Sequence, residues 1–137
     1  MSENAIDKGQ ALFAEIYGQD MADGCRKFAE SEGVANGEGF GPLQAKWSLE
    51  FPFGQLWTRE DRLSRKLRSL TVLGMLIGQG QSEEIKYHTK MGIKNGLTRQ
   101  ELEEVFYSAI PYCGFPIANT AKTAMLAAFA ELDAAAG

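Results

Sequence analysis

The segment from Leu70 to Gly96 constrains the fold of this chain more than any other part of the sequence. It begins as the apolar run LTVLGMLIG, breaks at Gly78 and Gly80, and then continues as a charged segment. A helix that is apolar on nearly every side is buried by neighbouring elements. The segment therefore predicts two helices that are joined by a tight glycine turn and covered by other helices or by another subunit.

The second of these helices carries Glu84 and His88, and His88 is the only histidine of the chain. In a helix, the spacing of four residues places both side chains on one face, one turn apart. Histidine changes its charge near neutral pH, and a carboxylate one turn away can hold its proton. The pair is a candidate acid–base site, although the same spacing also describes a surface or capping pair with no chemical role.

Helical periodicity recurs along the rest of the chain, and no alternating strand pattern is present. We expect an all-α, compact single-domain bundle of about six helices that spans residues 1–137. The expected helices cover residues 3–17, 42–51, 59–77, 81–94, 98–110 and 116–133, with a shorter helical piece at 21–30.

Residues that favour helix ends mark several boundaries. Ser82 is expected to cap the second helix of the central pair, and Thr98 followed by Glu101 forms a capping box. Pro52 should end or kink its helix, and Pro111 and Gly114 should interrupt the chain within IPYCGFP. The glycine-rich stretch 31–41 is interpreted as a flexible connection within the domain, or as a lid near a pocket.

Composition and charge exclude several classes of function. A net charge of -4 provides no basic face for nucleic acid. The polar start MSENAIDKGQ does not resemble a signal peptide, and no apolar run reaches membrane-spanning length. Cys25 and Cys113 form neither a CxxC nor a zinc-ligand spacing, so no redox motif and no metal site is indicated. We expect a cytoplasmic protein.

Arg68 stands where the basic first half of the expected helix 59–77 meets its apolar second half. A half-buried arginine is costly unless its charge meets an anion. A protein carboxylate or a substrate carboxylate could serve, and the sequence leaves both open.

Short motifs lie in a characteristic order from residue 53 to residue 119. They are FGQLWTR (53–59), Leu63, RSL (68–70), Glu84 with His88, NGLT (95–98), Glu101, Glu104, YCGFP (112–116) and Asn119. This order resembles the carboxymuconolactone decarboxylase family, and the resemblance covers the chain from about Phe40 to its end. The family shares its all-helical fold with the alkylhydroperoxidase D proteins, and its members assemble as trimers or hexamers.

The resemblance implies a site as well as a fold. It transfers a catalytic role to His88 and Glu84, and a role in binding the substrate carboxylate to Arg68. The implied reaction is the decarboxylation of an unsaturated lactone acid such as 4-carboxymuconolactone, without a cofactor, in the catabolism of aromatic compounds. Three aromatic side chains are candidates for walls around the substrate ring: Trp57, Tyr112 and Phe115.

Two features separate this chain from parts of that family. The peroxidase branch carries cysteines seven and four residues before the histidine, where this chain has Gln81 and Glu84, so thiol peroxidase chemistry is disfavoured. Many decarboxylase members have a histidine where this chain has Ser108, and the loop 31–41 looks longer than theirs. Another lyase or isomerase acting on a small carboxylated or lactone substrate stays open, as does a non-catalytic oligomeric binding protein.

Overall fold

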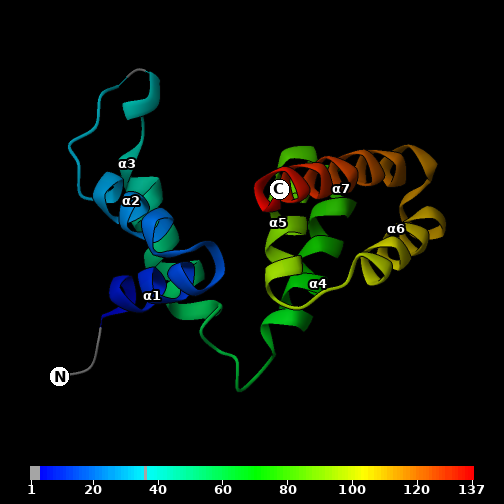
Figure 1. The fold of residues 1–137 in the computed structure, drawn as a ribbon, viewed down its shortest axis with the longest axis horizontal. Helices are drawn as coiled ribbons and strands as arrows, with labels where there is room; N and C mark the ends of the chain where they lie inside the picture. Colours follow the sequence, from blue (N-terminus) through cyan, green and yellow to red (C-terminus); the bar gives the residue numbers. More distant parts are fainter. Residues whose placement is uncertain (1–3, 36) are drawn as a thin grey trace. The chain divides into compact units, whose positions relative to one another are not determined.

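The computed structural model describes residues 4–35 and 37–137, and within these residues the chain forms helices and their connections without any strand (Figure 1). This confirms the predicted all-α class. The contacts within the chain divide it into two compact units, one ending at Ser64 and the other beginning at Arg65. That residues 1–137 act as a single domain stays a prediction.

The first unit contains three α-helices, a short 3₁₀-helix and a π-helical segment. Its core consists of apolar side chains from α1, from α2, from the π-helical segment and from the residue that follows that segment. Most of the predicted glycine-rich connection lacks a regular helix, apart from the 3₁₀-helix within it. The elements are α1 (Ala5–Tyr17), α2 (Gln19–Ala29), η1 (Gly37–Gly39), α3 (Pro42–Ser48) and η2 (Leu49–Leu56).

Two glycines allow α1 and η2 to pack backbone against backbone. A Cβ atom on Gly9 would lie 1.8 Å from the carbonyl oxygen of Leu49. A Cβ atom on Gly54 would lie 2.0 Å from the carbonyl oxygen of Ala5. Both distances are far below van der Waals contact, so only glycine fits at either position.

Pro52 changes the geometry of its helix without ending it. The chain passes from α3 directly into η2, which contains Pro52. The amide of Trp57 donates to the carbonyl oxygen of Pro52 at 2.7 Å, which is a bond over five residues. The wider turn of a π-helix relieves the clash between a proline ring and the preceding turn of an α-helix.

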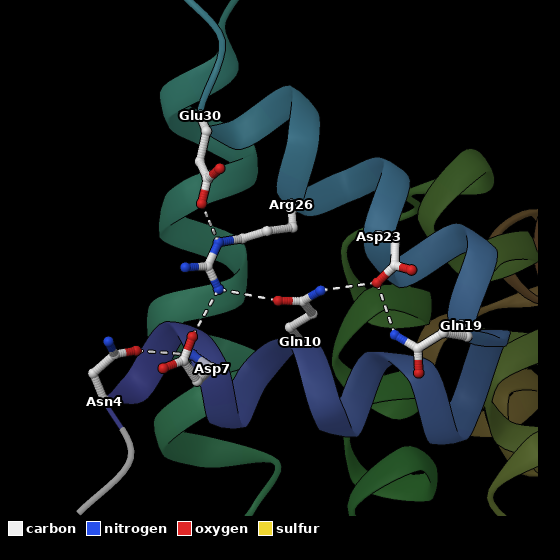
Figure 2. Close-up of polar contacts among 7 residues, drawn as sticks. All are labelled: Asn4, Asp7, Gln10, Gln19, Asp23, Arg26 and Glu30. Carbon is white, nitrogen blue, oxygen red and sulfur yellow. Dashed lines mark hydrogen bonds and ion pairs between the residues drawn. The ribbon is translucent and has the colours of Figure 1, made fainter. Parts of the chain in front are cut away.

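A polar network ties α1 to α2 (Figure 2). Arg26 Nη1 donates to Asp7 Oδ1 at 2.9 Å and to Gln10 Oε1 at 3.0 Å, and Arg26 Nε donates to Glu30 Oε1 at 2.6 Å. Gln10 in turn donates to Asp23 Oδ1 at 3.0 Å. Because the guanidinium is surrounded by partners from its own unit, we interpret Arg26 as a structural residue.

The second unit is a bundle of four helices that contains the predicted central pair. α4 ends at Gly78, close to the predicted break, and Gly80 has a φ of +67° in the turn that follows. α7 packs through alanines, which let neighbouring helices approach closely, and Ala118, Ala121 and Ala128 are fully buried. The helices are α4 (Arg65–Gly78), α5 (Ser82–Lys94), α6 (Arg99–Cys113) and α7 (Phe115–Ala136).

The expected start of the helix 59–77 is wrong, because α4 begins only at Arg65. The amides of Arg62 and Leu63 both donate to the carbonyl oxygen of Arg59, at 3.1 and 3.2 Å, and close an isolated turn there. Ser64 follows this turn, and serine favours the residue before a helix over its interior.

Three other predicted boundaries can be compared with the structure. The capping box of Thr98 and Glu101 is confirmed at the start of α6. Ser82 is the first residue of α5 rather than its cap, and the cap residue Gln81 makes no side-chain capping bond. α6 continues through Pro111 to Cys113, so the break comes at Gly114, whose φ of +93° only glycine adopts readily.

The glycine contact between α1 and η2 predicts a large difference between two Gly→Ala variants. Gly9→Ala should lower the free energy of unfolding by about 3 kcal/mol, because the new methyl group collides with the Leu49 carbonyl. Gly24→Ala in α2 is the control, since nothing lies within 4 Å of its new Cβ. It should gain up to about 1 kcal/mol from helix propensity. Urea unfolding measures both, and equal stability of the two variants would contradict the close packing.

Candidate active site

The two candidate catalytic residues lie on α5, whose inner face is tightly packed. Ile85 and Thr89 are fully buried on that face. A Cβ atom on Gly92 would lie 2.9 Å from Leu97 Cδ1 and 3.6 Å from Leu73 Cδ1. This packing holds α5 against α4 and determines which residues of α5 face outward.

Glu84 and His88 make the contact that their spacing predicted. Glu84 Oε2 lies 3.8 Å from His88 Nε2, which permits an electrostatic interaction but exceeds the length of a hydrogen bond. The side chain of His88 is 16% exposed, whereas that of Glu84 is 61% exposed. The structure thus places a largely buried imidazole beside a solvated carboxylate.

These surroundings perturb the titration of His88. Burial lowers the pKa of His88 below its ordinary value of 6.5, and the charge of Glu84 opposes this shift without cancelling it. The imidazole is therefore mainly neutral at pH 7. A neutral imidazole that can gain a proton under mild acid is suited to general acid–base chemistry.

Tyr87 is a neighbour of the imidazole that our sequence analysis did not single out. The ring of Tyr87 meets the ring of His88 edge-on, with centroids 5.4 Å apart and planes at 71°. The one sequence feature that could have indicated this contact is that Tyr87 directly precedes the only histidine of the chain. Consecutive helical residues point in different directions, so this contact could not be derived from spacing.

Arg68 is partly buried on α4, as expected. Its neighbour Ser69 accepts a hydrogen bond at 2.9 Å from Asn95 Nδ2, at the end of α5. Since α4 and α5 run antiparallel, this bond places Arg68 near the level of Asn95, seven residues beyond His88. At the rise per residue of an α-helix, these seven residues correspond to about 10 Å along α4 and α5. The backbones of Arg68 and His88 are therefore about two turns apart.

Tyr112 and Phe115 flank Gly114, where α6 gives way to α7. Tyr112 is 89% exposed and Phe115 is 66% exposed, so neither ring is packed within the second unit. Tyr112 borders a hollow of about 250 Å³ between α4 and α6 that Ser108 also lines. The Ser108 hydroxyl donates to the carbonyl oxygen of Glu104 at 2.8 Å, as serine commonly does within a helix.

The remaining sequence candidates are Trp57, which belongs to the other unit of the chain, and two thiols. Trp57 belongs to the first unit and is 4% exposed, so it is a core residue there, and its predicted role at the substrate stays a prediction. Cys25 and Cys113 are both free thiols and partly buried. Burial raises the pKa of Cys25, which reduces its reactive thiolate form.

Metal-ligand clusters and membrane-spanning helices are both absent from the part of the chain that the structure describes. Among residues 4–35 and 37–137, no three histidine, cysteine or acidic side chains gather as metal ligands would. In the same part of the chain, no helix combines the length and the apolar character needed to cross a membrane.

Comparison with known proteins identifies the family. Residues 42–129 match the sequence model of the carboxymuconolactone decarboxylase family, and that span is more than half of the 137 residues. The chain belongs to the carboxymuconolactone decarboxylase family. The matched span contains every candidate site residue, and the resemblance stated from the motifs is confirmed.

Two similar proteins each match about half or more of this chain. The chain is 43% identical over 67 residues to the nitrosuccinic acid decarboxylase npaB of Metarhizium robertsii, which covers 49% of this chain and 46% of that protein. It is 32% identical over 85 residues to a 4-carboxymuconolactone decarboxylase of Acinetobacter baylyi, covering 62% of this chain and 63% of that protein. In both pairs, the match spans less than two thirds of the relative.

The surroundings of His88 predict how its proton responds to Glu84. NMR titration of the single imidazole should give a pKa below 6.5, and Glu84→Gln should lower it further by removing the charge that opposes burial. Because the unfolded chain binds this proton more tightly, the free energy of unfolding should fall as the pH drops below 6.5.

Glu83→Gln is the matched control for this titration. Glu83 is the adjacent residue of α5, and its carboxylate lies 3.5 Å from Lys86 Nζ instead. Its removal should leave the His88 pKa nearly unchanged. A pKa above 6.5, or equal shifts in the two variants, would contradict the geometry of the pair.

Proposed function

We propose that this chain is a cofactor-independent carboxy-lyase in which His88 acts as the general acid. The contact of Glu84 with the largely buried His88 is the observation that carries this proposal. Both relatives are named as decarboxylases, which supports loss of carbon dioxide as the reaction type. The favoured substrate is an unsaturated lactone acid such as 4-carboxymuconolactone, which suggests a role in the catabolism of aromatic compounds in the cytoplasm.

The chemistry requires the protein to hold the substrate carboxylates, to stabilise an oxyanion and to deliver a proton to carbon. When the bond between the carboxylate and the γ-carbon breaks, carbon dioxide leaves and the electron pair moves through the ring double bond onto the lactone carbonyl oxygen. The resulting oxyanion needs a hydrogen-bond donor, and a carbon atom must then receive a proton. The conjugated lactone itself accepts the electrons, so the step requires no metal and no organic cofactor.

The candidate residues divide these tasks. Arg68 can hold a substrate carboxylate through the fork of its guanidinium, two turns away from the imidazole. His88 donates to the oxyanion or delivers the proton. Glu84 favours the protonated imidazole electrostatically, because its carboxylate lies close to Nε2 but beyond hydrogen-bond distance.

A second substrate class is favoured by the Metarhizium robertsii relative, whose name specifies nitrosuccinic acid. In that case the electron sink would be a nitro group on a short dicarboxylic acid, and the lactone ring would be absent. The same residues could serve, since a nitro group also accepts the electron pair and leaves an anion that must be protonated.

We expect the active form to be a closed homo-oligomer, a trimer or a hexamer, as the family resemblance implies. Four large apolar side chains on α4 and α7 are substantially exposed in the second unit, and such side chains are typical of an interface. They are Leu67, Leu70, Met75 and Leu126. A neighbouring copy would also help to enclose the exposed Tyr112 and Phe115.

The roles of His88 and Glu84 predict a non-additive pair of mutations. His88→Gln should lower the turnover of the active substrate by about a hundred- to ten-thousandfold with the fold intact. Glu84→Gln should cost less, and the double variant should be no slower than His88→Gln, because Glu84 acts through the imidazole. Release of carbon dioxide from 4-carboxymuconolactone and from nitrosuccinic acid measures turnover, with Glu83→Gln as the control. Full additivity, or an active His88→Gln protein, would overturn the assignment.

The absence of cysteines at positions 81 and 84 predicts that no thiol chemistry takes place at this site. The protein should not reduce peroxides at the expense of thiols, and Cys113→Ala should retain turnover while losing some stability. Cys25→Ala is the control for general effects of removing a partly buried thiol. Peroxide turnover that Cys113→Ala abolishes would assign the chain to the peroxidase chemistry instead.

A further inference from the structure

A hollow between α6 and α7 is lined by residues outside the motifs and outside the proposed reaction site. It encloses about 510 Å³, which lies within the range of pockets for small organic ligands. Its apolar lining includes the partly buried rings of Phe106 and Phe129 and the buried Met125. Aromatic rings and thioether sulfur both pack favourably against an aromatic ring. The lining is therefore suited to a ligand that carries one.

An ion pair joins the two walls of the hollow at one end. Arg99 on α6 donates to both carboxylate oxygens of Asp133 on α7, and its guanidinium lies 4.7 Å from the centre of the Phe129 ring. Further along, Lys122 Nζ on α7 lies 5.8 Å from the centre of the Phe106 ring on α6. These contacts show that the two helices run antiparallel and that the charge of Arg99 is already neutralised.

Two opposite charges line the hollow without neutralising each other. Glu103 on α6 and Lys122 on α7 are both exposed, and neither makes an ion pair among residues 4–35 and 37–137. The helix contacts place them about one turn, or ~5 Å, apart along the hollow, on opposite helices. Unlike charges that face one hollow and do not pair are complementary to a ligand that carries both signs close together.

We propose that the hollow between α6 and α7 binds a free aromatic α-amino acid. The ring of the ligand packs against Phe106, Met125 and Phe129. Its carboxylate pairs with Lys122 and its ammonium group with Glu103, and both side chains are flexible enough to close on the one carbon that carries the two groups. A ligand with a carboxylate alone would leave Glu103 beside a like charge, and an amine alone would do the same to Lys122.

The expected affinity is modest, because both charges are exposed. An ion pair in contact with solvent contributes little to binding, since water screens it and ordering the side chains costs entropy. For a ligand of this size we expect a dissociation constant of about 0.1 to 1 mM. Such a site would respond to millimolar changes in the concentration of an amino acid.

Three probes that share one phenyl ring test the two charges separately. L-phenylalanine carries both charges, hydrocinnamate lacks the ammonium group and phenethylamine lacks the carboxylate. NMR titration of the methionine methyl groups of the whole chain measures their affinities and locates the site. The Met125 signal should shift and saturate, whereas that of Met75, an exposed residue of α4 that does not line the hollow, should stay in place. Hydrocinnamate and phenethylamine should each bind at least about threefold more weakly than L-phenylalanine.

Two substitutions should each weaken only the probes that use the charge removed. Lys122→Gln should weaken L-phenylalanine and hydrocinnamate by about three- to tenfold but should not weaken phenethylamine. Glu103→Gln should weaken L-phenylalanine and phenethylamine to a similar degree but should not weaken hydrocinnamate. This crossed pattern separates pairing with the ligand from a general loss of fold, which would weaken every probe. Glu104→Gln is the matched control and should change no affinity, because Glu104 is the next exposed acid of α6 and does not line the hollow.

Three results would overturn the proposal. One is a Met125 signal that does not shift with L-phenylalanine up to about 10 mM. Another is equal affinity for all three probes, or equal losses in the two variants, which would show that the charges select nothing. The third is a Met125 shift that disappears as the protein concentration rises, which would show that a second copy rather than a small molecule covers the hollow.

Discussion

The packing of α5 against α4 is the constraint on which the candidate site depends. Gly92 lies where the two helices meet, and a Cβ atom there would come too close to Leu97 Cδ1, at 2.9 Å, and would touch Leu73 on α4 at 3.6 Å. The hydrogen bond from Asn95 to Ser69 holds the helices in register along their length. Together these contacts determine how deeply His88 is buried and at which level of the α4–α5 pair Arg68 lies.

The candidate pair combines two opposed electrostatic environments. Burial disfavours the imidazolium form of His88, whereas the solvated carboxylate of Glu84 favours it. The outcome is a pKa below the ordinary value, so the imidazole is mainly neutral at pH 7, and the minor protonated form is a stronger acid toward a substrate than an ordinary imidazolium. A fully exposed pair would have an ordinary pKa, and a fully buried pair would incur a large desolvation cost.

The two units are packed internally in different ways. In the first unit, Gly9 and Gly54 allow backbone contact, and the network around Arg26 connects α1 with α2. In the second unit, the alanines of α7 fill the interior and leave larger apolar side chains on the outside. The second unit holds the candidate catalytic pair together with the exposed surface that we assign to self-association.

The sequence by itself determined the all-α class, the glycine break between α4 and α5, the capping box of α6 and the pairing of Glu84 with His88. Each of these depends on spacing within a few residues, where helical geometry leaves little freedom. The order of the short motifs along the sequence was also sufficient to identify the family.

Only the tertiary structure decided how those local features are used. α4 begins late, at Arg65, and the chain makes a wide turn around Pro52. Both features depend on local backbone hydrogen bonds, which residue preferences predict poorly. The exposure of Tyr112, the burial of His88 and the offset between Arg68 and His88 depend on contacts between helices far apart in the sequence. Burial and helix register arise from packing, and packing is a property of the assembled helices rather than of any one segment.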